Sequence, residues 1–289
     1  AGNPNCGKTT LFNELTGSNG YVGNWPGVTV EKKQATWRVD KNVTFVDLPG
    51  IYSLSPYSPE ETVSRDYIVN ERPDAIINLL DVTNLERNLY LTTQVLEAGR
   101  PVVVGLNMID LLKERGDVID TKVLSEKLGV PVIEVSALHN TNVTELVKAA
   151  IEAGKKDVPA QGPKCFSPEV ETALTKIAGL IADVAPAALS RWYSIKVFER
   201  DASADKSAQL EEIISAVEKS RDDDAESIIT SDRYEWIATV MAAAVKKAPK
   251  KLTRSEKIDR IVTNRILGLP IFIAVMTLVY FLAISTVGT

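Results

Sequence analysis

The chain has 289 residues, 45% of them hydrophobic and 25% charged, a composition typical of folded protein with room for more than one domain. Its formal net charge of −5 gives no general attraction to nucleic acid, which argues against a protein that binds nucleic acid along its whole length. Cys6 and Cys165 lie far apart and His139 is the single histidine, so the sequence suggests neither a disulfide framework nor a zinc site.

Residues 2–9, GNPNCGKT, match the phosphate-loop pattern G-x-x-x-x-G-K-[ST]. The two glycines let the backbone curl so that its N–H groups point inward, and the following helix directs its positive end at the same point. Such a loop binds a polyphosphate, with Lys8 on the β- and γ-phosphates and the Thr9 hydroxyl on a bridging Mg²⁺. The alternative is a glycine-containing turn before a helix, and the pattern alone does not separate ATP from GTP. The residues expected at the nucleotide are Gly2, Asn3, Pro4, Asn5, Cys6, Gly7, Lys8, Thr9 and Thr10.

The next segment is predicted to alternate loops with extended stretches. A helix is predicted over 10–15, and the glycine-rich run 20–29 has no usable period and is interpreted as a mobile loop. Alternation over 37–46 around a turn predicts an antiparallel hairpin that leads into Asp47-Leu-Pro-Gly50. A phosphate-loop enzyme needs an acidic group at this place, so Asp47 is expected to hold Mg²⁺ through water and the Gly50 N–H to sense the γ-phosphate. A type I or II turn around the proline is the alternative.

Short apolar runs at 75–80, 102–106 and 130–135 alternate with helical patterns at 85–98 and 143–153. Strands that alternate with helices predict a parallel sheet covered on both faces. A phosphate loop also follows a strand, so we expect the chain to begin within its first strand. Ligands bind such sheets at the carboxyl ends of the strands. The residues that follow two of these strands include Asn107, Met108, Asp110, Ser136, Ala137 and Leu138.

An N-x-x-D after one strand and an S-A after the next, in order with the phosphate loop and D-x-x-G, resemble the motifs of Ras-like GTPases. The resemblance implies an α/β fold, a Ras-like P-loop GTPase domain with a mostly parallel sheet. It also implies that Asp110 accepts from guanine N1–H and N2–H₂ while the backbone of Ser136 and Ala137 meets its O6. A carboxylate favours these paired donors and repels adenine's acceptor, so we expect GTP or GDP. Met108 stands where these enzymes usually have lysine, which predicts an apolar side chain over the base.

Two departures from that pattern concern hydrolysis. Ile51 follows D-x-x-G, where Ras-like enzymes have a water-positioning glutamine, and isoleucine cannot orient water by hydrogen bonding. Asn5 resembles the asparagine of potassium-activated GTPases, which helps to hold K⁺ against the phosphates; alternatively, it only tightens the loop. Glu60 and Glu61 could position the water, but the simpler interpretation is that they begin a surface helix.

Four segments closely resemble the cytosolic GTPase domain of the bacterial ferrous iron transport protein B family: 2–9, 22–31, 47–54 and 84–90. The resemblance implies that Thr29 is the first-switch threonine, which ligates Mg²⁺ and the γ-phosphate only in the GTP state. The alternative is a β-branched residue that opens the next strand.

The resemblance also completes the expected site. Gly27 and Val28 join Thr29 at the nucleotide, and catalysis is assigned to Asn5, Lys8 and Thr29. Mg²⁺ is assigned to Thr9, Thr29 and Asp47, and K⁺ to Asn5. Cys6 stands where many family members have serine, and we expect it to make the site thiol-reactive without altering function.

Residues 159–163 interrupt all periodicity and are interpreted as a linker, which ends the GTPase domain at residue 158. Residues 159–250 are then predicted to form a small helical domain. Its helices are expected over 167–181, 190–198, 206–219 and 225–245. The charged run 221–224 is interpreted as a solvated turn and not a metal site. The family resemblance implies that this domain stabilises the GDP-bound state and couples the GTPase to the membrane.

Residues 266–287 contain no charged residue and are long enough, as a helix, to cross a bilayer core; a buried core helix is the alternative. The basic cluster in 246–265 favours the cytoplasmic side, so the GTPase domain is expected to face the cytoplasm. Residues 251–289 are therefore predicted to be a basic juxtamembrane segment and a first transmembrane helix. The family resemblance extends over 258–270 and implies a bacterial inner-membrane protein whose permeation machinery lies beyond residue 289.

The leading hypothesis is the GTP-hydrolysing cytosolic part of a ferrous iron transporter, slow and stimulated by potassium, that couples nucleotide state to Fe²⁺ uptake. Its expected cofactors are GTP or GDP, Mg²⁺ and K⁺. Its expected partners are the bilayer, further membrane segments of the same protein, small cytosolic accessory proteins and, in a homo-oligomer, other copies, but not nucleic acid. Two alternatives stay open. A membrane-tethered regulatory switch would transport nothing, and an RNA-linked GTPase of ribosome assembly would need a basic attachment. No His, Cys and carboxylate cluster in the sequence specifies iron.

Overall fold

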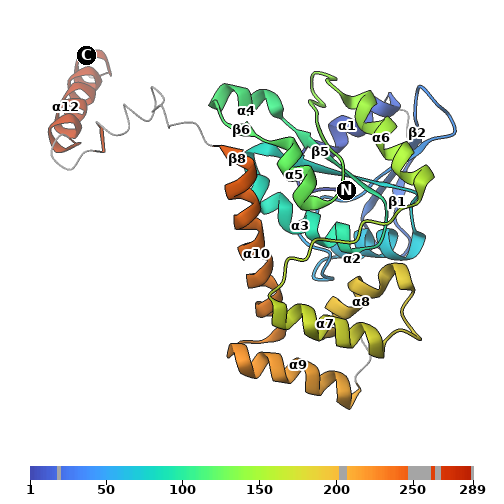
Figure 1. Ribbon diagram of the computed structural model, residues 1–289. Helices are drawn as coiled ribbons and strands as arrows, with labels where there is room; N and C mark the ends of the chain where they lie inside the picture. The colour runs from blue at the N-terminus through green and yellow to red at the C-terminus, as the bar shows by residue number, and fades with distance from the viewer. Residues whose placement is uncertain (18–20, 202–206, 247–261, 264–267, 288–289) are drawn as a thin grey trace. The chain divides into compact units, whose positions relative to one another are not determined.

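The structure, a computed structural model, describes residues 1–17, 21–201, 207–246, 262–263 and 268–287, except for the side chains of 113–115 and 282–287. Residues 1–247 form one compact unit and residues 248–289 form a second. Figure 1 traces the larger unit from the N-terminal phosphate loop to helix α10 (Ala225–Ala244) and strand β8 (Val245–Lys246).

The larger unit contains a parallel sheet in the order β4 (Ile76–Asp81), β5 (Val102–Asn107), β7 (Val132–Glu134). The N-terminal residues run beside β4, where the Leu79 N–H donates a 2.9 Å hydrogen bond to the Ala1 carbonyl. Every residue of β5 is buried, because both faces of the sheet are covered. The predicted parallel sheet is confirmed.

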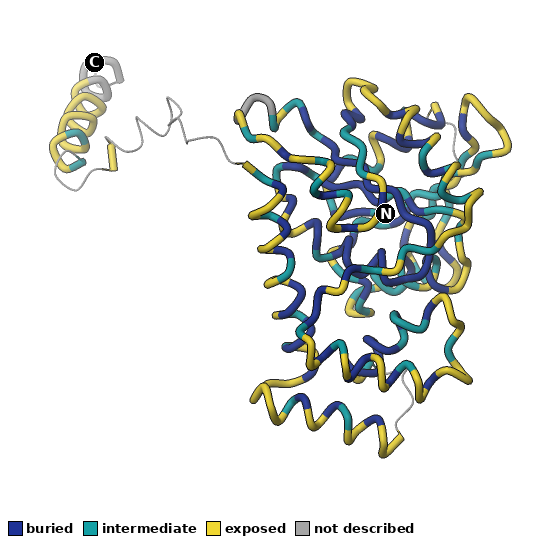
Figure 2. Tube along the Cα trace, in the orientation of Figure 1, coloured by how far each residue is buried: buried dark blue, intermediate teal, exposed yellow. Residues whose placement is uncertain are grey.

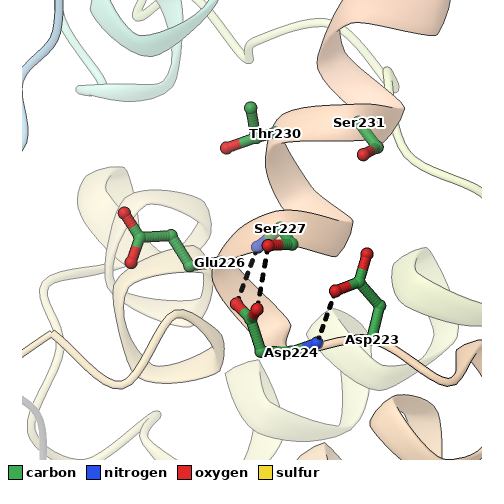
Figure 3. Close-up of a pocket in the computed structure, with 6 residues that line it drawn as sticks. All are labelled: Asp223, Asp224, Glu226, Ser227, Thr230 and Ser231. Carbon is green, nitrogen blue, oxygen red and sulfur yellow. Dashed lines mark hydrogen bonds between the residues drawn. The ribbon is translucent and has the colours of Figure 1, made fainter.

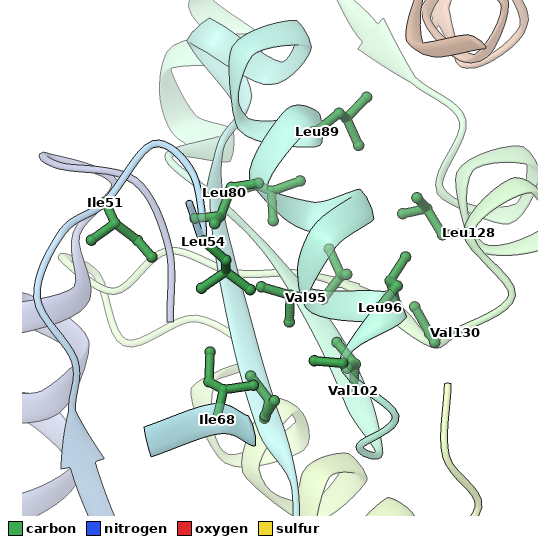
Figure 4. Close-up of a cluster of buried hydrophobic side chains, with 14 of the residues drawn as sticks. Ile51, Leu54, Ile68, Leu80, Leu89, Val95, Leu96, Val102, Leu128 and Val130 are labelled. Carbon is green, nitrogen blue, oxygen red and sulfur yellow. The ribbon is translucent and has the colours of Figure 1, made fainter. Parts of the chain in front are cut away.

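Successive strand residues point to opposite faces of the sheet, so each face has its own apolar core. The helices that cover the sheet are α1 (Lys8–Thr16), α3 (Leu85–Glu97), α5 (Thr121–Leu128) and α6 (Val143–Lys156). Leu79 packs in the core that includes α1 and α6. Leu80 packs in the core that includes α3 and α5, which Figure 4 shows. Shorter elements are α2 (Pro59–Asp66), the π-helical turn η1 (Tyr67–Glu71), the 3₁₀ turn η2 (Val82–Asn84), α4 (Ile109–Arg115) and β6 (Val118–Ile119).

An antiparallel sheet has the order β1 (Tyr21–Asn24), β2 (Glu31–Thr36), β3 (Thr44–Asp47). The predicted hairpin is confirmed as β2 and β3, but its first strand lies earlier than the alternation at 37–39 indicates. The interpretation of 20–29 as a loop is wrong in part, since β1 lies within it and pairs with β2 along its whole length. An edge strand with mostly exposed side chains lacks apolar alternation, and the sequence pattern therefore misses it.

The predicted helices of the C-terminal part are confirmed within the described residues. They are α7 (Pro168–Leu180), α8 (Ser190–Phe198), α9 (Ala208–Arg221) and α10, with the 3₁₀ turn η3 (Ala187–Leu189) before α8. Ser167 precedes α7 and Pro168 occupies its first position, where the fixed φ of proline suits a helix start. These helices share an apolar core that includes Val170, Ile195 and Ile214.

Helix α10 belongs to both parts of this unit (Figure 1). Near its start, Ile229 lies in the core of the helical part, whereas Ile237 and Val240 lie in the core that includes α3 and α5. Between them, the buried guanidinium of Arg233 forms a 2.7 Å ion pair with Glu97 of α3. Along this helix, buried and exposed positions alternate (Figure 2). The boundary expected at residue 158 stays a prediction, and α10 packs in the α/β core as well as in the core of the helical part.

Beyond α10, strand β8 pairs with β6 in an antiparallel ladder. In the second unit, α12 (Gly268–Val287) carries exposed apolar side chains that include Phe272, Met276 and Tyr280. Among the residues that the structure describes, no helix is both long and apolar enough to cross a membrane. The span expected over 266–287 is therefore not confirmed, and most of the predicted basic cluster in 246–265 lies outside the described residues.

Candidate nucleotide site

The phosphate loop links the N-terminal residues beside β4 to the start of α1. Asn5 has φ 62° and Gly7 has φ 94°, left-handed values that let successive backbone N–H groups turn toward one point. A Cβ atom on Gly7 would lie 2.3 Å from Asn107 Nδ2, so the close approach of these two residues requires glycine. The loop has the form that its sequence pattern predicts.

Lys8 and Gly50 come together on this loop. Lys8 Nζ donates to the carbonyls of Gly2 over 3.0 Å and Asn3 over 2.7 Å. A Cβ atom on Gly50 would lie 3.1 Å from Lys8 Nζ and 2.9 Å from Pro4 Cα. The glycine of D-x-x-G therefore lies directly against the phosphate loop and the Lys8 side chain.

Thr9 and Asp47 form the pair expected to hold Mg²⁺. The Thr9 hydroxyl donates to Asp47 Oδ2 over 3.4 Å, between the first turn of α1 and the end of β3. A hydroxyl and a carboxylate are oxygen ligands of the kind that Mg²⁺ prefers, so the two side chains fit this ion. Thr10, the next residue of α1, is exposed.

The base end of the site is connected to the phosphate loop by Asn107. Its Nδ2 donates to the Cys6 carbonyl over 2.8 Å, and its Oδ1 accepts from the Ala137 N–H over 2.9 Å. The Ser136 hydroxyl donates to Asp110 Oδ1 over 3.2 Å. The two base-recognition motifs, predicted from separate strand ends, are thus brought together.

Neighbouring residues shape this end of the site. Met108 adopts a left-handed φ of 67° at the start of α4, directly before the segment that carries Asp110. Ala137 is buried, while Leu138 is 76% exposed. The Met108 side chain is half-buried against the main core, and its predicted packing over the base stays a prediction.

The predicted first-switch residues lie in a turn between β1 and β2. Gly27 has φ 76°, Val28 is half-buried, and Thr29 is exposed. The Val28 N–H donates to the Trp25 carbonyl over 3.3 Å, so the turn closes on itself. The turn that carries Thr29 is therefore held by a hydrogen bond between its own residues.

Residues after D-x-x-G are fixed by a side chain that the sequence analysis missed. Gln94 of α3 is 1% exposed, and its Oε1 accepts from the Leu54 N–H over 2.6 Å and from the Ser53 hydroxyl over 3.2 Å. Ile51 is buried in the core and cannot reach a water by hydrogen bonding. Gln94 is a polar residue on the buried face of the helix predicted over 85–98, and buried polar groups need hydrogen-bond partners, so the sequence alone could have indicated its role.

Glu61 belongs to a helix cap. The Ser58 hydroxyl accepts from the Glu61 N–H over 3.2 Å, which is an N-cap contact, and it also donates to the Glu61 carboxylate over 3.2 Å. The interpretation of Glu60 and Glu61 as the start of a surface helix is confirmed by α2.

Cys6 contradicts the expectation of a thiol-reactive site. Its side chain is completely buried, and this burial raises the pKa of the thiol above its usual value. A buried thiol with a raised pKa supplies little thiolate, which is the reactive form. The cysteine therefore serves as a small apolar residue in the core below the loop.

The charged run 221–224 connects the end of α9 to the start of α10, beside a pocket lined by Asp223, Asp224, Glu226, Ser227, Thr230 and Ser231 (Figure 3). Asp224 caps the helix, accepting from the Ser227 N–H over 2.9 Å and from the Ser227 hydroxyl over 2.8 Å. The predicted turn is confirmed, with Asp222 in a left-handed conformation.

Comparisons with known families agree with this geometry. The sequence model of a family described as ferrous iron transport protein B matches residues 1–150, and that of the FeoB cytosolic helical domain matches residues 166–246. An Fe(2+) transporter FeoB of Escherichia coli strain K12 is 38% identical over 99% of this chain, and an Fe(2+) transport protein A/Fe(2+) transporter FeoB fusion protein of Porphyromonas gingivalis is 39% identical over 96%. The chain spans 38% and 36% of the lengths of these two relatives.

Solved structures agree as well. A GDP-bound mutant of the S. thermophilus FeoB G-domain is 45% identical with a TM-score of 0.81, over 85% of this chain and 97% of that one. NFeoB from S. thermophilus bound to GDP.AlF4- and K+ is 46% identical with a TM-score of 0.75, over 83% and 96%. Since the first family model matches more than half of the 289 residues, the chain belongs to the ferrous iron transport protein B family.

Proposed function

We propose that this chain binds GTP and GDP with Mg²⁺, hydrolyses GTP, and serves as the cytosolic GTPase part of a bacterial ferrous iron transporter. The observation that carries the proposal is that Asn107 bonds to the Cys6 carbonyl and to the Ala137 N–H, and so connects the phosphate loop to the segment after β7. The phosphate loop leads to the pair of Thr9 with Asp47, and the segment after β7 contains Ser136, which pairs with Asp110. The first pair suits a Mg²⁺ ion on phosphates, and the second suits the donors of a guanine base.

The roles of the side chains follow from where they lie. The amide groups of the loop and the start of α1 favour a polyphosphate, and the Lys8 ammonium adds positive charge beside them. The Asp110 carboxylate accepts hydrogen bonds, so it selects guanine and disfavours adenine. Mg²⁺, when bound, supplies charge that stabilises the developing negative charge on the phosphates. Thr9 and Asp47 would hold it, with Thr29 joining them in the GTP state.

Asn5 supports a role for potassium. It lies exposed on the phosphate loop in a left-handed conformation, directly before the buried Cys6. Its amide oxygen is a ligand that K⁺ accepts, and a cation there would add charge that an arginine supplies in other GTPases. A solved relative bound to GDP.AlF4- and K+ supports the same proposal for this chain.

The wider setting is also a proposal. Curated relatives carry the name Fe(2+) transporter, and the chain spans about two fifths of their length or less. We propose that residues 166–246 couple nucleotide state to Fe²⁺ uptake, that residues 266–287 enter the inner membrane, and that the GTPase faces the cytoplasm. Further membrane segments, small accessory proteins of the kind fused in one relative, and further copies of the chain are proposed partners.

The test exchanges the base acceptor. Asp110→Asn replaces one carboxylate oxygen with an amide donor, so the preference should move from GTP to xanthosine triphosphate. The loss of GTP affinity should be about tenfold to hundredfold, the scale of one or two unpaired groups. Competition against a fluorescent guanine nucleotide measures it.

Asp120→Asn is the matched control. Asp120 caps α5 ten residues further on by accepting from the N–H groups of Lys122 and Val123, and asparagine can cap in the same way. Unchanged GTP selectivity in Asp110→Asn would refute the assignment of the base site. In vesicles with the full-length transporter, Fe²⁺ uptake by Asp110→Asn should respond to xanthosine triphosphate and no longer to GTP; uptake indifferent to either nucleotide would refute the coupling.

A further inference from the structure

The turn between β1 and β2, here named the first-switch turn (residues 25–30), is closed by its own backbone. The Trp25 N–H donates to the Val30 carbonyl over 2.8 Å, and the Val28 N–H donates to the Trp25 carbonyl over 3.3 Å. Trp25 and Val30 are buried in the main core, whereas Thr29 between them is exposed. The turn therefore has two buried ends and carries its threonine outward.

The Trp25 ring is held by aromatic and cationic neighbours. It meets Tyr67 of η1 edge to face, with ring centroids 5.3 Å apart and planes at 69°. On its face, Lys32 Nζ lies 4.6 Å from the ring centroid. Tyr67 begins the π-helical turn that directly continues α2, an irregularity that is frequent at functional sites. The contact thus joins the first-switch turn to the helix that follows D-x-x-G.

The same ring carries an unpaired polar group. Trp25 Nε1 is buried and has no hydrogen-bond partner among the described residues. Burial of the ring stabilises the docked conformation, but the unpaired N–H opposes it and would gain a partner in a conformation that exposes the indole. Because the two contributions oppose each other, a ligand with modest preference for one conformation can shift the balance.

We propose that Trp25 is a latch that holds the first-switch turn away from the phosphates until GTP binds. The proposal rests on the proposed function, in which Thr29 ligates Mg²⁺ and the γ-phosphate. In this proposal, the movement that brings Thr29 to Thr9 and Asp47 opens the hydrogen bond between the Trp25 N–H and the Val30 carbonyl, because Thr29 lies inside the closed turn. GTP binding therefore releases Trp25 from Tyr67, whereas GDP, without a γ-phosphate, leaves the indole docked.

The first experiment compares the affinities of the 289-residue chain for GMPPNP and GDP. Tyr67→Leu removes the edge-to-face contact and should raise the affinity for GMPPNP relative to GDP by about threefold, the scale of an aromatic pair. Trp25→Ala removes the whole latch and should raise this ratio by about tenfold. Tyr67→Phe keeps the ring and should leave the ratio unchanged.

Trp37→Phe is the matched control for a buried tryptophan. Trp37 follows β2 in another turn and lies in the other apolar core, so its substitution should alter the two affinities by the same factor. An equal change of both affinities in Tyr67→Leu and Trp25→Ala would overturn the latch. Failure of the unaltered chain to bind either nucleotide would instead overturn the proposed function.

The second experiment follows hydrogen exchange in the unaltered chain. The amides of Trp25 and Val28 donate within the closed turn, so GMPPNP should reduce their protection while GDP should not. Tyr67→Leu should reduce their protection already in the GDP state. Equal protection with both nucleotides, at concentrations where binding is measured, overturns the latch and leaves the nucleotide site intact.

Discussion

The base end of the site and the first-switch turn are held in opposite ways. At the base end, Asn107 is buried and connects the phosphate loop to the loop of Ser136 and Ala137 through two hydrogen bonds. In the first-switch turn, Thr29 is exposed, and the turn depends on the docking of Trp25 against Tyr67. One end is fixed by paired polar groups, and the other by an aromatic contact with an unpaired N–H.

This difference suits two separate tasks of a nucleotide switch, which are selecting the base and sensing the γ-phosphate. Selecting a base requires donors and acceptors at fixed positions, since a loose site leaves the wrong base nearly as well bound as the right one. Sensing a γ-phosphate requires two conformations of similar free energy, since a ligand shifts an equilibrium only by its differential affinity. We propose that the end held by Asn107, here called the firm end, recognises the base, and that the first-switch turn, here called the sensing end, responds to the γ-phosphate.

Breaking the firm end should have the largest effect. Asn107→Ala leaves the Ala137 N–H and the Cys6 carbonyl unpaired and lets the two loops move apart, so affinity should fall about hundredfold. GDP and GMPPNP should be affected alike, because both carry the base and the first two phosphates. Titration with fluorescent nucleotides measures the loss, and Asn13→Ala, at an exposed position of α1, is the control. A loss of affinity for GMPPNP alone would contradict the assignment of Asn107 to the part of the site that GDP and GMPPNP share.

Breaking the sensing end should have a smaller and selective effect. Thr29→Ala removes the hydroxyl expected at Mg²⁺ and the γ-phosphate, so GMPPNP affinity should fall about tenfold, the scale of one charge-assisted contact. GDP affinity should stay within a factor of about two, since GDP offers no γ-phosphate. Thr36→Ala, at an exposed threonine on β2, should change neither affinity. An equal loss for both nucleotides would count against a sensing role.

The smallest effect on nucleotide affinity is expected at Asn5, which lies on the phosphate loop but is assigned to the hydrolysis step. Asn5→Gly preserves the left-handed backbone at φ 62° and removes only the side chain, so nucleotide affinity should be nearly unchanged. The ratio of turnover in KCl to turnover in NaCl should fall to about one, because the cation loses a ligand. Asn5→Asp keeps a ligand oxygen and should retain a K⁺ effect. A K⁺ effect that persists in Asn5→Gly would refute the role of this side chain.

Much of the fold and of the firm end could be predicted because both follow from local rules. The strands at 76–81 and 102–107 are apolar runs between helical patterns, and a parallel sheet brings their carboxyl ends to one edge. Asn107 and Ala137, which follow two such strands, could therefore be assigned to one edge although they lie far apart in sequence. The restricted backbone of Gly7 follows from its motif, and its approach to Asn107 confirms it.

The lightly held parts could not be predicted, because they depend on contacts between distant segments. No sequence pattern around Trp25 or Tyr67 predicts their edge-to-face contact. For Gln94, the sequence indicates only that a polar residue lies on an apolar helix face. The edge strand β1 lacks apolar alternation because most of its side chains are exposed. Cys6 was expected to be reactive from its place in a loop, but the loop buries it completely.

The ladder between β6 and β8 has a mechanical consequence. Val118 pairs with Lys246 and Ile119 with Val245, and the Asp120 N–H donates to the Ala244 carbonyl over 2.8 Å. Strand β6 begins three residues after α4 ends, and α4 carries Asp110. A force on the chain that follows β8 therefore acts on the ladder with β6, close in sequence to the helix that carries Asp110.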